Sequence, residues 1–126
     1  MSLSLDEIIS QYMPSDHSVQ EISEFFSVFA QETRIKLISL LSISPLSVGE
    51  IGRALRMNQT TVSHQLRILK DRRIVASTRR GKEIVYAIAS EGINDILFQA
   101  VKVTETRGVS FAEMLPKESV SGGRSF

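Results

Sequence analysis

Residues 47–72 form two short amphipathic segments with only three turn residues between them. Apolar side chains recur at helical spacing in both, at Val48, Ile51 and Leu55 and then at Val62, Leu66 and Leu69. Ser47 and Glu50 fit a capping box at the first start, and Asn58 is a good N-cap for the second helix. The turn is too short to separate the helices, so the pattern predicts a helix-turn-helix.

A β-hairpin is expected directly after the second helix. Residues 74–89 are rich in strand-forming residues, and 84–88 are apolar nearly throughout. Arg80-Gly81-Lys82 is the predicted turn.

Four further helices are indicated by apolar periodicity. Residues 4–13 begin with a capping box and end before Pro14. A second helix begins near Ser18, with Glu21 completing its box, and is expected to bury Ile22, Phe25, Phe26 and Phe29. The others are 33–42, ended by Ser44-Pro45, and 90–107. The expected fold is mainly α with a small β-hairpin (α+β), a winged helix-turn-helix with N- and C-terminal dimerisation helices. It should span residues 1–107, followed by a partly disordered extension over 108–126.

Basic side chains are concentrated in one window. Residues 53–82 hold nine of the 15 Lys and Arg and one acid, Asp71, although the whole chain has a formal net charge of +1. Both flanks are acidic. A basic face of this density attracts a polyanion through Coulomb forces and counterion release. Charge and architecture together predict binding to double-stranded DNA.

The second helix of the pair is the predicted reading element. With its apolar stripe inward, it turns short or planar hydrogen-bonding residues outward, namely Gln59, Thr60, Ser63, His64 and Arg67. Gln can pair with adenine and Arg with guanine in the major groove. Lys70, at the helix end, is expected near the DNA backbone. The basic hairpin tip (Arg79, Arg80 and Lys82) fits a minor groove or phosphates, although alone it could be only a solvated surface.

The composition gives little support for an enzyme or a metal-binding protein. There are no cysteines, which excludes disulfides and thiolate metal sites, and the two histidines belong to no recognisable catalytic arrangement. We therefore expect no enzyme activity, no metal site and no cofactor. The sequence shows neither a secretory signal nor an apolar run of membrane-spanning length, so a cytoplasmic protein without a membrane partner is expected.

The first and last helices carry apolar stripes that a compact winged-helix core does not need. They predict a homodimer interface formed by Leu5, Ile8, Ile9, Tyr12, Ile93, Ile96, Leu97, Ala100 and Val101. The alternative is that these helices pack within their own subunit.

Four segments resemble the ArsR/SmtB family of transcriptional repressors. They are residues 29–41 (FAQETRIKLISLL), 46–55 (LSVGEIGRAL), 58–75 (NQTTVSHQLRILKDRRIV) and 79–86 (RRGKEIVY). The second resembles the family's L-x-V-x-E-L-A-x-x-L, and the last its R-x-G-x-x-x-x-Y wing. In the recognition-helix segment, Gln65 replaces the usual histidine and Arg73 the usual glycine.

The resemblance implies a homodimeric repressor on an inverted-repeat operator, which many members leave when a metal binds. The family's C-x-C metal motif reads Ser47-Val48-Gly49 here, and Leu97 occupies the histidine position of its D-x-H motif after Asp95. The known metal motifs are thus missing, and a small-molecule or protein effector stays open. The alternative function is a nonspecific architectural DNA-binding protein or a winged-helix protein-interaction module.

Overall fold

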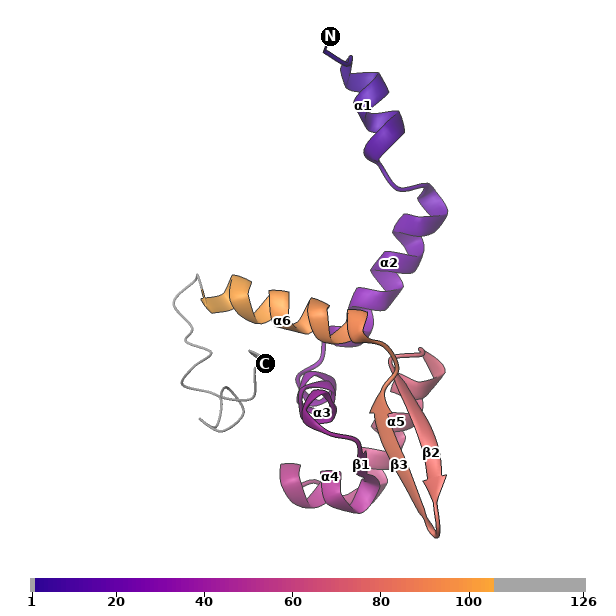
Figure 1. Cartoon of the computed structure of the whole chain (residues 1–126), viewed down its shortest axis with the longest axis vertical. Coiled ribbons are helices and arrows are strands. Elements are labelled where there is room, and N and C mark those ends of the chain that lie inside the picture. Colours follow the sequence, from indigo (N-terminus) through magenta and orange to yellow (C-terminus); the bar gives the residue numbers. More distant parts are fainter. Residues whose placement is uncertain (1, 106–126) are drawn as a thin grey trace.

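The computed structural model describes residues 2–105, which form six helices and a three-stranded antiparallel sheet (Figure 1). The elements in chain order are α1 (Leu5–Tyr12), α2 (Asp16–Phe29), α3 (Glu32–Ile43), β1 (Leu46–Ser47), α4 (Val48–Leu55), α5 (Gln59–Asp71), β2 (Val75–Arg80), β3 (Glu83–Ile88) and α6 (Glu91–Glu105). This order confirms the predicted fold class. The expected 108–126 extension lies outside the described residues.

The predicted capping residues start the helix-turn-helix pair. The backbone N–H of Glu50 donates to Oγ of Ser47 over 3.2 Å, and the Ser47 N–H donates to Oε1 of Glu50 over 2.9 Å. At α5, the Thr60 N–H donates to the Asn58 side chain over 2.7 Å. These bonds satisfy N–H groups that a helix start leaves unpaired. The boundaries of both helices are therefore set locally.

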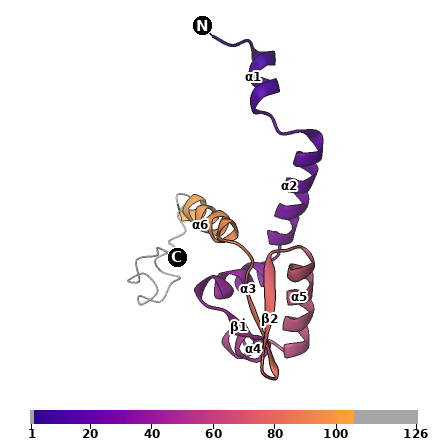
Figure 2. The same cartoon turned by 45° about the vertical axis from the view of Figure 1, so that its right-hand side comes forward.

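The prediction for α2 was wrong in two respects. The helix begins at Asp16 and is capped by Ser15, whose Oγ accepts from the Ser18 N–H over 3.1 Å. Ile22 and Phe26, expected to be buried, are 45% and 52% exposed. The periodicity correctly marks an apolar face, but this part of α2 projects from the body of the chain (Figures 1 and 2).

The sheet has the order β1-β3-β2, so β3 is paired on both sides. The pairing of Arg80 with Glu83 makes Arg80 a strand residue and leaves Gly81 and Lys82 as the turn, one residue shorter than expected. Gly81 has a φ of +62°, a conformation that tight hairpin turns require and glycine adopts without strain. The two-residue strand β1 was not predicted. It ties β3 to the start of α4.

The core lies between α3, α4, α5 and the base of the hairpin. Its fully buried side chains are Leu37, Ile38, Ile51, Val62, Leu66, Leu69 and Ile74. All three α5 residues were predicted to face inward, and each is 0% exposed. At about 1.5–3 kcal/mol for each such side chain, this stripe fixes which face of α5 turns toward solvent.

Helix α5 ends in a Schellman motif. The N–H of Ile74 donates to the Leu69 carbonyl, and the N–H of Arg73 donates to the Lys70 carbonyl, both over 2.9 Å. Arg73 has a φ of +60°, in the left-handed region where glycine is favoured. Burial of Ile74 holds this geometry despite the arginine.

The N-terminal arm, residues 4–29, extends away from the hairpin. Both views place α1 at the end of the molecule opposite the β2–β3 turn (Figures 1 and 2). Helix α1 has no buried residue. Its amphipathic face thus finds no cover among the described residues of its own chain.

Candidate nucleic-acid interface

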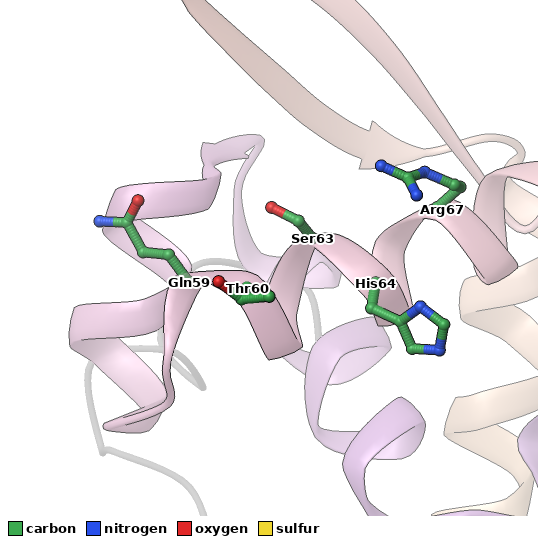
Figure 3. A pocket seen from close by; sticks show the side chains of 5 residues that line it. All are labelled: Gln59, Thr60, Ser63, His64 and Arg67. Carbon is green, nitrogen blue, oxygen red and sulfur yellow. The ribbon is translucent and has the colours of Figure 1, made fainter.

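The five residues predicted to read DNA line one shallow surface cavity on α5, of about 420 Å³. They are Gln59, Thr60, Ser63, His64 and Arg67. Figure 3 shows them following one another along the helix, with Gln59 in the first turn and Arg67 toward the C-terminal end. All except the half-buried Ser63 are exposed. The predicted cluster is therefore a continuous, solvent-facing surface.

This surface offers hydrogen-bond donors and acceptors from five neighbouring side chains. Arg67 presents a guanidinium fork that matches the O6 and N7 atoms of guanine, and the Gln59 amide matches adenine. Both side chains are long enough to reach base edges from a helix seated in the major groove. The arrangement can recognise a short base sequence.

The wing carries cations at its tip. Nε of Arg79 donates to the Gly81 carbonyl over 3.2 Å, which holds this side chain against the turn. Arg80 and Lys82 are exposed. The hairpin end thus carries three exposed charges, and the Arg79 charge is held by a hydrogen bond to the turn.

Lys70 is tied to the wing as well as placed at the end of α5. Its Nζ donates to Oγ of Ser77 in β2 over 2.7 Å. Sequence reasoning did not find this contact, because Ser77 has no helical or charge pattern to mark it. The bond joins the recognition helix to the strand that leads to the hairpin tip.

A second side-chain hydrogen bond joins α5 to α3. Nε of Arg34, near the start of α3, donates to Oε1 of Gln65 over 3.1 Å, and both side chains are half-buried. Gln65 was noted only as a departure from the family's histidine. The signal available in the sequence was a polar residue beside the buried stripe of α5, which calls for a partner.

The capping box of α4 also has an electrostatic effect. The Ser47 N–H, with a smaller contribution from the Ser47 hydroxyl, lowers the pKa of Glu50, and the positive charge of Arg53 acts in the same direction. Burial opposes this shift. The lowered pKa keeps the carboxylate ionised to a more acidic pH than an ordinary glutamate, so the box stays intact over a wider pH range.

The residues predicted for a dimer interface divide into two groups. Leu5, Ile8, Ile9 and Tyr12 are exposed along α1. In α6, Ile93 and Leu97 are instead 4% and 5% exposed and belong to the core of their own subunit. The expectation that these two face a second subunit is corrected, because the first turns of α6 pack over the hairpin and α3. Ile96 and Val101 are half-buried, and Ala100 is exposed.

Within residues 2–105, no group of three or more His, Cys, Asp or Glu side chains is arranged to hold a metal. His17 pairs instead with Glu21 on the surface of α2, at 3.1 Å. A second cavity, of about 450 Å³, lies between α2 and the α5–β2 connection. No helix in the described range is both long and apolar enough to span a membrane.

The sequence of this chain is similar to those of known proteins. A sequence profile described as "Bacterial regulatory protein, arsR family" matches residues 31–77. A transcriptional repressor SmtB homolog from Synechocystis sp. is 33% identical over 93 residues, which cover 71% of this chain and 70% of the relative. The chain belongs to the ArsR/SmtB family. It is a winged helix-turn-helix, DNA-binding transcriptional regulator.

The fold is also similar to that of solved transcriptional regulators. The AntR antimony-specific transcriptional repressor superposes with a TM-score of 0.71 at 28% identity, covering 86% of this chain and 97% of AntR. The homodimeric winged helix-turn-helix DNA-binding domain from Mycobacterium bovis gives a TM-score of 0.68 at 25% identity, covering 76% and 92%. The family identified from the four sequence segments is thus confirmed.

Proposed function

We propose that this regulator is a homodimeric repressor that binds an inverted-repeat operator, with α5 of each subunit in the major groove and the wing against the flanking backbone. The observation that carries the proposal is the α5 surface itself. Its buried stripe is fully closed, and its opposite face gathers the five hydrogen-bonding side chains over one cavity. A repressor with this geometry acts by occupying DNA that transcription requires.

The dimer is supported by the N-terminal arm. Leu5 and Tyr12 are each 70% exposed, and Ile8 and Ile9 are 41% and 46% exposed, on a helix without internal cover. A standard interface of about 1,600 Å² needs an apolar surface of this kind. Two-fold symmetry would place two recognition helices about 34 Å apart, one turn of the double helix, which matches an inverted repeat.

We also propose that release from DNA is not triggered by a transition metal, because the family's known metal motifs are missing. The chain has no cysteine, and the position that would carry a histidine in α6 is the core residue Leu97. A thiolate or imidazole set for a borderline metal would have to be assembled from other residues. Selection of operators with and without Zn²⁺, Ni²⁺ and Cd²⁺ tests this, since metal-dependent loss of the selected DNA would contradict it.

The central experiment separates base reading from backbone attraction. Arg67→Ala should lose discrimination at one base position by about 1–3 kcal/mol, because a bidentate contact is removed. Arg80→Ala should weaken binding to all sequences similarly and flatten the salt dependence by about one unit, because only a phosphate contact is lost. Binding of both variants to operator and scrambled duplexes is measured over a range of salt concentrations.

The alternative function gives a different result in the same experiment. A nonspecific architectural protein would show no preferred sequence in the wild type, and Arg67→Ala would behave like Arg80→Ala. A protein-interaction module would bind duplex DNA only weakly, with or without either substitution.

A further inference from the structure

The side chain of Gln59 lies along α4, over two glycines. A methyl group placed on Gly52 would lie 3.6 Å from Cγ of Gln59, and one placed on Gly49 would lie 3.7 Å from its Nε2. The first turn of the recognition helix thus rests a long side chain across the neighbouring helix. The direction of its amide depends on how much room α4 leaves.

Gly49 and Gly52 have different surroundings. At Gly52 an added methyl would meet the Met57 carbonyl oxygen at 3.0 Å, so backbone atoms demand the glycine there. At Gly49 the same methyl meets only side chains, and the closest is Nη1 of Arg53 at 3.4 Å. These are ordinary contact distances. The fold therefore accepts a methyl group at Gly49, whereas a longer side chain would compete with Arg53 and Gln59 for the same space.

Arg53 extends the basic surface at this point. It is exposed on α4, and its guanidinium borders the same space as the Gln59 amide. A guanidinium beside a base-reading amide is placed to contact a phosphate or a base edge next to the one that the amide reads. The Gly49 gap, defined as the space bordered by Gly49, Arg53 and Gln59, thus joins α4 to the reading surface of α5.

We propose that Gly49 is a specificity-determining residue of the DNA interface, because the gap at this position sets the direction in which Gln59 and Arg53 reach the DNA. The inference rests on the proposed function, since Gln59 must read a base. According to this proposal, a residue on α4, outside the recognition helix, influences which base is preferred at the outer end of the half-site.

The test fills the gap and compares it with a matched position. Gly49→Ala and Gly49→Leu are made in the full chain. Gly92→Ala and Gly92→Leu serve as controls, because Gly92 is likewise the second residue of its helix and a methyl there would meet only Oγ of Ser90, at 3.8 Å. Thermal unfolding checks that each variant folds, and Gly49→Met, also made in the full chain, keeps the test decisive where Gly49→Leu does not fold. Gly49→Ala adds only a methyl group in ordinary contact with its neighbours and should keep the wild-type preference.

Each folded protein then selects duplexes from a random-sequence pool. Gly49→Leu should change the preferred base at one position of each half-site, with discrimination there falling about fivefold or more, while the Gly92 variants keep the wild-type preference. In a Gln59→Ala background, Gly49→Leu should cause no further change at that position, because the side chain through which it acts is gone.

The experiment distinguishes failure of the proposed function from failure of the inference about Gly49. If the wild type selects no sequence, the proposed function fails and the inference fails with it. If the wild type selects a sequence and Gln59→Ala alters it, but Gly49→Leu and Gly49→Met leave it unchanged, the base-reading role stands and the role of Gly49 is overturned. If Gly49→Leu still changes the preference at the base position read by Gln59 in the Gln59→Ala background, the proposal is also overturned.

Discussion

At the scale of single residues, the backbone conformation of Arg73 is the least expected feature. Its φ of +60° costs a side-chain-bearing residue about 1–2 kcal/mol relative to a right-handed conformation. The two Schellman hydrogen bonds and the burial of Ile74 hold it in place. The exit from the recognition helix is thus strained where glycine would leave it relaxed.

Arg73→Gly should therefore raise the free energy of unfolding by about 1 kcal/mol. Relief of the left-handed strain exceeds the added chain entropy of glycine in the unfolded state, about 0.4–1 kcal/mol. Thermal denaturation measures the effect as a rise in Tm. The control is Arg73→Ala, which removes the same charge but keeps a Cβ and the strain, and it should show no such rise. Equal Tm values for the two variants would contradict this explanation.

At the scale of elements, α5 is held between two side-chain bridges. Arg34 braces its middle against α3, and Lys70 joins its end to Ser77 of the wing. The reading surface and the basic hairpin tip are thereby fixed relative to each other. The proposed docking uses both at once, with α5 in the groove and the hairpin tip on the DNA backbone.

Lys70 and Ser77 should act as one unit in DNA binding. Ser77→Ala and Lys70→Met are each expected to weaken operator binding about two- to fivefold, the range of a surface charge-assisted hydrogen bond. The double variant should be no weaker than Lys70→Met alone, because both changes break the same bond. The double-mutant cycle is completed by measuring the dissociation constants of the wild type, both single variants and the double variant for one operator. Additive losses would show that Lys70 reaches phosphate independently of Ser77.

The elements also show which features a sequence can reveal. Caps at Ser47 and Asn58, the buried stripe of α5 and its five outward residues were all predicted, since each depends on spacing within one helix. Features that depend on residues far apart in the chain were not predicted. The pairing of β1 with β3 and the Arg34–Gln65 bond join segments far apart in the chain. A local pattern can mark Gln65 as a polar residue that needs a partner, but it does not show which distant residue supplies the partner.

The same reason explains the errors in burial. Apolar periodicity identified Ile22, Phe26, Ile93 and Leu97 as one-sided helix faces, but it does not say what covers each face. The structure places Ile93 and Leu97 in the core and leaves the α2 residues exposed. A prediction of burial needs the path of the helix relative to the body, which three-dimensional packing alone determines.

At the scale of the whole molecule, the chain separates two surfaces. The reading surface and wing tip lie at one end, and the apolar arm lies at the other (Figures 1 and 2). Association through the arm would leave the reading surface open. Dimerisation and DNA binding can therefore be tested by substitutions that lie far from each other.

Ile8→Glu should dissociate the dimer without unfolding the subunit. Ile8 is 41% exposed and α1 has no buried residue, so a charge there disturbs no contact within the chain core. Operator affinity should fall as the second half-site contact is lost. Sedimentation velocity measures the mass, and Ser10→Glu on the polar side of the same helix adds an equal charge as the control. A dimeric mass for Ile8→Glu would exclude α1 from the interface.

The uncovered arm has a consequence for how such a regulator responds in a living cell. When two molecules must meet before both half-sites can be occupied, the number of competent pairs at low abundance rises as the square of the copy number. A modest change in synthesis or degradation is then amplified at the promoter. The apolar face of α1 would thus make the cell's own dosage of this protein part of its regulatory signal.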